Sequence, residues 1–154
     1  DAVHDWNIRG VTKAQLTELI RILKPVGQVF ITSQLPLQKE FSDYELKIPI
    51  DKIHSVLDGA QIFVGESPTM AVESGILGVP SFLVSNRVAI LGNMISLEEW
   101  GVLKNYSTWE DFFQNIQEDY KPGLSKEQWF NNSNKFVAAM DNINKVILDA
   151  IVEQ

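Results

Sequence analysis

The fold is decided by the stretch from Gln61 to Ser85, QIFVGESPTMAVESGILGVPSFLVS. A short apolar run breaks at Gly65-Glu66-Ser67-Pro68, helical spacing follows as far as Gly78, and a second apolar run closes the stretch. Ser67 is a favoured N-cap residue, Pro68 suits the first helical position, and Gly78 is a usual stop signal. The stretch therefore predicts a strand, a helix and a second strand.

The two apolar runs have the pattern of buried parallel strands. Both are short and continuous rather than alternating, and the helix between them suits a crossover, which is right-handed in nearly every known case. The turn at 65–69 then lies at the carboxyl end of a buried strand, where open α/β sheets bind ligands. We expect an α/β fold, a Rossmann-like parallel sheet with helices on both faces.

Composition sets the class of protein. With 154 residues, 45% of them hydrophobic, the chain suits a single domain over residues 1–154. A net charge of −7 argues against non-specific binding to nucleic acid or to an anionic membrane. The absence of cysteine excludes disulfides, and two histidines argue against a zinc site. No transmembrane segment or signal peptide is evident, so we expect a soluble, cytoplasmic protein.

The rest of the chain predicts alternating β and α elements. The opening, Asp1 to Trp6, reads as the tail of an earlier element, so we expect an excised fragment. The aromatic clusters Trp109-Phe112-Phe113 and Trp129-Phe130 suit a core or an interdomain contact. Helices are expected at 12–23, 52–59 (capped by Asp51), 95–100 and 108–120, and from 125 onward with a break at 141–142. A strand is expected at 28–31, an extended piece at 48–50 and an edge strand at 102–103. The segment 33–44 is expected to be a loop with room for a short helix.

The central turn has the features of a phosphate site. A helix N-terminus offers unpaired N–H groups and a partial positive charge. Pro68 removes one donor, but the N–H groups of Thr69 and Met70 and the hydroxyls of Ser67 and Thr69 remain. Glu73, one helical turn beyond Thr69, is placed to accept hydrogen bonds from a ribose diol. The alternative is that Ser67 is only a cap and Glu73 only a solvated helix residue.

Four further residues are weaker candidates. His4 and Asp5 fall where the first strand of such a domain would end, and histidine suits acid/base work, although a loop histidine bonded to its neighbour is the alternative. Arg87 follows the second strand and would neutralise a diphosphate, or it is simply solvated. For His54, in the helix before the central strand, a packing or capping role is favoured.

Three segments carry a family resemblance: KIHSVL at 52–57, QIFVGESPTMAVESGILGVP at 61–80 and LEEWGVL at 97–103. They resemble the carboxyl-terminal half of a prokaryotic family of glycosyltransferase-like proteins, long labelled only as a domain of unknown function. That family is itself similar to UDP-N-acetylglucosamine 2-epimerases and other GT-B proteins. Segments 3–5, 28–33 and 140–143 also fall where the family has comparable stretches, so the likeness covers nearly the whole chain.

The resemblance implies the carboxyl-terminal half of a GT-B architecture, in which two Rossmann-like domains face a cleft and this half holds the nucleotide of a sugar donor. It implies that Ser67 faces the diphosphate, that Thr69 and Met70 offer backbone N–H groups, and that Glu73 holds the ribose. The epimerase-like relatives have two glycines where this chain has Pro68-Thr69, which removes one donor and adds a side chain, whereas Ser-x-Thr-Met is a pattern of the glycosyltransferase-like family itself. The implied nucleotide-binding set is Glu66, Ser67, Pro68, Thr69, Met70, Glu73 and Arg87, with His4 and Asp5 as catalytic residues.

The expected function is that of a nucleotide-sugar-binding domain, for a UDP-sugar, in a GT-B glycosyltransferase-like enzyme. The nucleotide-sugar is a substrate, and no cofactor and no metal are implied. The expected partners are the nucleotide-sugar donor and the N-terminal GT-B domain of the same protein, so the isolated fragment would bind without turnover. A sugar-nucleotide 2-epimerase, or a non-catalytic binding or assembly module of the same fold, remains an alternative.

Overall fold

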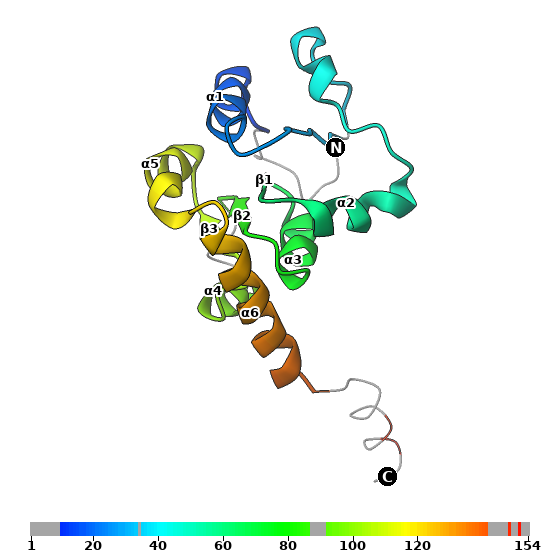
Figure 1. Ribbon diagram of the computed structural model, residues 1–154, viewed down its shortest axis with the longest axis vertical. Helices are drawn as coiled ribbons and strands as arrows, with labels where there is room; N and C mark the ends of the chain where they lie inside the picture. The colour runs from blue at the N-terminus through cyan, green and yellow to red at the C-terminus, as the bar shows by residue number, and fades with distance from the viewer. Residues whose placement is uncertain (1–9, 34, 87–91, 142–147, 149–150, 152–154) are drawn as a thin grey trace.

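The predicted strand, helix and strand form the centre of the molecule. In the computed structural model, which describes residues 10–33, 35–86, 92–141, 148 and 151, β1 (Phe63–Gly65), α3 (Pro68–Ile76) and β2 (Ser81–Val84) follow one another. β1 and β2 pair in parallel, with Val64 opposite Phe82. The prediction for this stretch is therefore confirmed (Figure 1).

A third strand completes the sheet. β3 (Lys104–Tyr106) pairs in parallel with β2, so the spatial order is β1, β2, β3. The sequence placed this strand at 102–103, two residues too early. Val102 and Leu103 are fully buried as the chain enters the strand, which is why their apolar side chains resembled a strand themselves.

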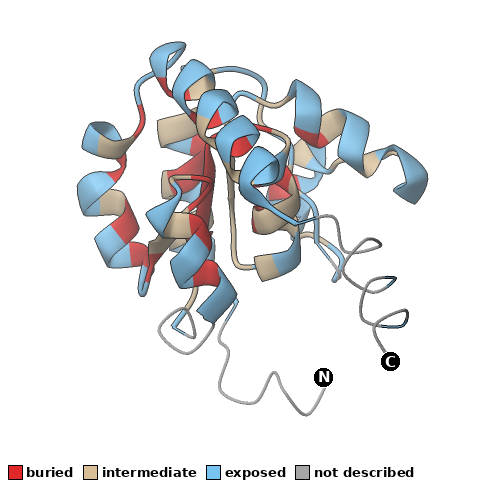
Figure 2. Ribbon diagram, turned by 90° about the horizontal axis from the view of Figure 1, so that it is seen from below, coloured by how far each residue is buried: buried red, intermediate tan, exposed pale blue. Residues whose placement is uncertain are grey.

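Helices cover both faces of the sheet because successive residues of β2 point to opposite sides. Phe82 packs in a cluster with side chains of α1 (Lys13–Leu23) and α5 (Trp109–Asp119), whereas Leu83 packs against α3 and α4 (Gly92–Glu99). Figure 2 shows the buried residues gathered in the sheet and on the inner sides of the helices. The structure is thus a mixed α/β fold with a small parallel sheet and flanking helices, as predicted.

The last long helix, α6 (Leu124–Ala139), runs across the amino-terminal end of the sheet. The Ser133 hydroxyl donates a hydrogen bond to the carbonyl of Ile76, at the end of α3. The Asn132 side chain donates to the carbonyl of Gly101, ahead of β3, at 3.1 Å. Since Ile76 and Gly101 both lie before the strands they lead to, α6 covers the amino ends and leaves the carboxyl ends to other segments.

The helices before β1 agree with the sequence except at one cap. α1 begins after Thr12, which forms a capping box with Gln15. A short 3₁₀ helix, η2 (Lys39–Tyr44), fills the predicted loop, and a second, η3 (Ile50–Lys52), leads into α2 (Ile53–Gly59). Asp51 does not cap α2, because it lies inside η3 and its side chain pairs with Lys52 instead.

The predicted strand at 28–31 is wrong. Within this segment only Ile31 makes a bridge, in parallel with Glu45. The Ile31 N–H donates to the Tyr44 carbonyl and the Ile31 carbonyl accepts from Leu46, so its backbone groups are used away from the sheet. Phe30 consequently stays 51% exposed instead of entering the core.

The aromatic clusters enter the core except at one position. Trp109, Phe112 and Trp129 are buried and Phe113 packs against the same cluster, while Phe130, which lies against Gly78, is 55% exposed. α6 ends at Ala139, and the helix expected beyond the break falls mostly outside the described residues. None of the described helices is long and apolar enough to cross a membrane.

We expect Gly75→Ala to destabilise the fold. A Cβ at Gly75 would lie 2.4 Å from the backbone carbonyl of Val102, which cannot move without shifting the chain that enters β3. Urea denaturation should show a loss of about 1–3 kcal/mol, as for other overpacked sites. Gly59→Ala is the matched control, since nothing lies within 4 Å of its added Cβ. Equal stability of the two variants would contradict this packing.

We expect stability to fall above about pH 10 because of Tyr106. Burial, followed by the hydrogen bond that its hydroxyl donates to Asp119, raises the pKa of Tyr106 above the ordinary value of 10.0. The unfolded chain then loses this proton while the folded chain keeps it, so alkaline pH favours unfolding. Tyr106→Phe should flatten the decline in the free energy of unfolding between pH 9 and 11 measured by urea titration, and an unchanged slope would contradict the assignment.

Candidate functional site

The turn after β1 presents the N-terminus of α3 at the carboxyl end of the sheet. Ser67 and Thr69 are exposed, and Pro68 occupies the first helical position. The Ser67 hydroxyl accepts a long hydrogen bond of 3.4 Å from the N–H of Met70. The N–H of Thr69 makes no hydrogen bond with any described residue. The turn therefore offers one unpaired donor and one weakly held donor to an anion.

Glu73 lies one helical turn above these donors, as predicted, and its side chain is 36% exposed. Its Oε2 atom lies 3.3 Å from Nε2 of His54, which comes from α2. The sequence favoured a packing or capping role for His54. The structure instead places its imidazole on the surface, 62% exposed, with Glu73 as its partner. Two residues on neighbouring helices are brought together by a contact that spacing along the chain did not reveal.

Glu66 ties three segments together at the same end of the sheet. One carboxylate oxygen accepts the N–H of Val11, just before α1, at 3.2 Å. The other accepts the indole N–H of Trp109, at the start of α5, at 2.9 Å. Both carboxylate oxygens thus accept hydrogen bonds from other parts of the fold, and the carboxylate points toward α1 and α5. Among the described residues of the predicted nucleotide-binding set, Glu66 is thus held by contacts with distant segments of the fold.

The remaining predicted site residues cannot be placed with the turn. His4, Asp5 and Arg87 lie outside the described residues. Among the described residues, no three His, Asp or Glu side chains gather closely enough to hold a metal ion. The described part of the site thus consists of Ser67, Thr69, Met70 and Glu73, to which the structure adds His54.

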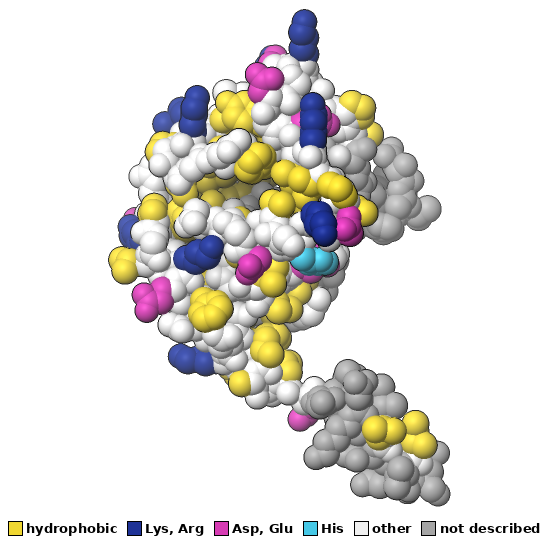
Figure 3. All heavy atoms as spheres, turned by 45° about the vertical axis from the view of Figure 1, so that its right-hand side comes forward, with side chains coloured by type: hydrophobic (Ala, Val, Ile, Leu, Met, Phe, Trp, Pro, Cys, Tyr) yellow, Lys and Arg dark blue, Asp and Glu magenta, His cyan; other side chains and the backbone are white. Residues whose placement is uncertain are grey.

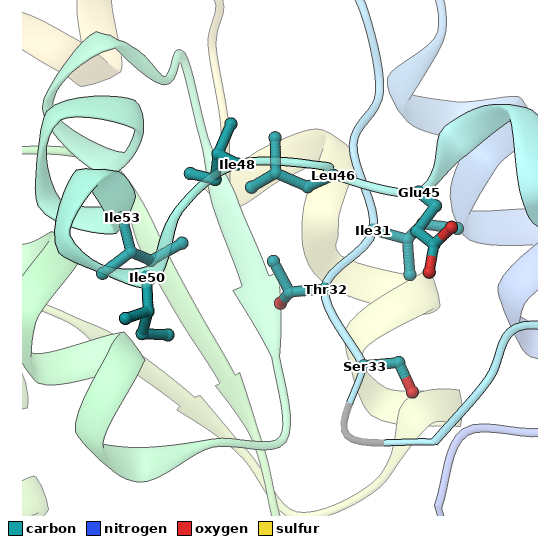
Figure 4. A pocket seen from close by; sticks show the side chains of 8 residues that line it. All are labelled: Ile31, Thr32, Ser33, Glu45, Leu46, Ile48, Ile50 and Ile53. Atoms are coloured by element: carbon teal, nitrogen blue, oxygen red, sulfur yellow. The ribbon is translucent and has the colours of Figure 1, made fainter.

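A separate pocket of about 170 Å³ lies between the segment 31–33 and the segment that leads into α2. Figure 4 shows Ile48, Ile50 and Ile53 on one side, with the segment 31–33 across from them. None of the nucleotide-binding candidates that the structure describes lines it. Its lining residues are Ile31, Thr32, Ser33, Glu45, Leu46, Ile48, Ile50 and Ile53.

Comparisons with known proteins leave the family of the chain open. The sequence matches no model of a known protein family, no curated protein and no solved structure. The function must therefore be argued from the turn itself.

We expect Glu66→Gln to destabilise the fold even though it keeps the size of the side chain. The amide has one acceptor where the carboxylate has two, so either Val11 or Trp109 faces an N–H donor. Thermal and urea denaturation should show a loss of about 1–3 kcal/mol, the range for an unsatisfied buried group. The control is Glu118→Gln, because Glu118 is exposed on α5 and has no partner among the described residues. A Glu66→Gln variant as stable as this control would show that the tether is dispensable.

Proposed function

We propose that the chain binds a nucleotide-sugar, a UDP-sugar, as the donor-binding half of a GT-B glycosyltransferase-like enzyme. The observation that carries this proposal is the spacing within α3. Unpaired donors at the N-terminus of the helix are followed, one turn later, by a carboxylate on the same helix, at the carboxyl end of a parallel strand. That is the order in which a nucleoside diphosphate presents its diphosphate and its ribose.

The diphosphate would bind the N-terminus of α3. The N–H of Thr69, in the first turn of α3, has no hydrogen-bond partner among the described residues. Ser67 and Thr69, which carry the two hydroxyls, are exposed. The helix dipole adds partial positive charge at this end. Pro68 stands where the epimerase-like proteins have glycine. It lacks an N–H donor, but it occupies the first helical position, where the N–H of a residue has no partner within the helix.

The ribose would bind Glu73. Glu73 lies four positions beyond Thr69 along the helix, a rise of about 6 Å. One oxygen, Oε2, faces His54, and Oε1 has no hydrogen-bond partner among the described residues. A carboxylate oxygen accepts hydrogen bonds only, so it suits the two hydroxyls of a ribose diol.

In this proposal the domain contributes electrostatics rather than covalent chemistry. As the sugar leaves, negative charge grows on the diphosphate, and fixed N–H groups at the helix end stabilise it without a metal. Arg87 adds a positive charge to the diphosphate site, and His4 and Asp5 supply acid/base groups at the cleft. Transfer also requires groups from an N-terminal GT-B domain, so the chain alone binds the donor and does not turn it over.

The test is an isothermal titration with UDP, with the other nucleoside diphosphates and with UDP-N-acetylglucosamine. We expect saturable binding that prefers one base. Glu73→Ala should weaken it about tenfold, as expected for the loss of a hydrogen bond to a charged group, and Ser67→Ala should weaken it less.

The matched control is Thr108→Ala. Thr108 caps α5 as Ser67 caps α3, its hydroxyl accepting from the N–H of Asp111 at 3.1 Å. Both variants should lose a similar amount of stability, about 1 kcal/mol, but only Ser67→Ala should change the affinity for nucleotide. Absence of binding to any nucleotide by the folded wild-type protein would overturn the proposal.

A further inference from the structure

We infer that His54 is a positioning residue that holds the Glu73 carboxylate for the ribose. The inference rests on the proposed nucleotide site and adds to it a residue from a second helix. Neither the turn nor the helix α3 contains His54, which is supplied by α2 (Figure 1). The ribose end of the site would then be built from two elements rather than one.

The geometry engages only half of the carboxylate. Nε2 of His54 lies 3.3 Å from Oε2 of Glu73, while Oε1 has no partner among the described residues. A glutamate side chain on a helix surface otherwise samples several rotamers, and a ligand that needs one of them must order it. By holding Oε2, the imidazole presents Oε1 in a fixed place before the ligand arrives.

The charges around His54 leave Glu73 as its partner. α3 and η3 pack most closely against α2, and Lys126 of α6 donates hydrogen bonds to the carbonyls of Asp58 and Ala60 at its far end. Glu73 is the titratable residue of α3, while η3 contributes Asp51 and Lys52, whose charged atoms lie 3.4 Å apart and pair with each other. Asp58 follows one turn further along α2 itself. Imidazole can donate a proton from Nε2 in its neutral and in its charged form, so the contact with Glu73 does not require protonation.

The pair is better suited to orienting a ligand than to holding the fold. Both side chains are more than one-third exposed, and water screens such surface pairs so that they add little to stability. The His54 side chain is 62% exposed, and Figure 3 shows histidine (cyan) at the surface with basic and acidic side chains beside it. A contact that stabilises little and leaves an acceptor free at the surface has its main consequence for whatever binds there.

The experiment compares UDP with 2′,3′-dideoxy-UDP, which lacks the ribose hydroxyls that Glu73 would accept. Dissociation constants are measured by isothermal titration for the wild type, His54→Ala, His54→Gln and Glu73→Ala, and for His54→Ala combined with Glu73→Ala. The readout is the ratio of the two affinities, which a general loss of stability does not change.

We expect the wild type to prefer UDP by about tenfold, the worth of a hydrogen bond to a charged group. His54→Ala should reduce this preference about threefold and leave the affinity for the dideoxy compound unchanged. His54→Gln should keep the preference for UDP near that of the wild type, because the amide nitrogen of glutamine reaches Glu73 about as well as Nε2 of histidine does. Glu73→Ala should abolish the preference, and His54→Ala should have no further effect in that background.

Three results would overturn the inference. If His54→Ala prefers UDP over the dideoxy compound as strongly as the wild type does, the positioning role is refuted, while the proposed nucleotide site stands. An equal loss of affinity for both compounds would assign His54 a structural role only. Failure of the folded wild type to bind either compound would overturn the proposed function, and the inference with it.

Discussion

The parallel pairing of β1 with β2 requires the chain to cross from one end of the sheet to the other, and α3 makes this crossing. α3 is held to the sheet from within: the buried hydroxyl of Ser81 donates to the carbonyl of Ala71 at 2.7 Å, and Gly75 lets the helix approach the backbone of Val102. Every feature of the candidate site follows from this placement. The direction of α3 sets its N-terminus at the carboxyl end of β1, and its helical pitch sets Glu73 one turn above.

The part of the fold that the sequence predicts is the part governed by local signals. Ser67 and Pro68 start α3 and the turn at Gly78 ends it, and these preferences depend on a few neighbouring residues. The candidate donors and Glu73 were predictable for the same reason, because helical spacing alone places them. Thr108 likewise starts α5 with its own side chain.

The parts that the sequence did not predict depend on residues far apart in the chain. The segment at 28–31 has the composition of a strand, but its backbone pairs with 44–46, and no local pattern records that choice. The contact of Glu66 with Trp109 spans 43 residues, and that of His54 with Glu73 joins two helices. Such contacts arise from packing between distant segments. In the sequence alone, an acidic residue in a turn therefore has the same pattern whether its side chain binds a ligand or stabilises the fold.

The surroundings of Phe82 bear on how the protein is made. The rings that lie against it belong to Tyr106, Phe112, Tyr120 and Trp129, and all of them follow it in the chain. On the ribosome, the central strand emerges with side chains of α1 already made but without these four rings, and the last of the rings arrives with α6. Because an exposed apolar strand invites aggregation, the growing chain depends on its final helices, or on a chaperone, to shield the sheet until synthesis has passed them.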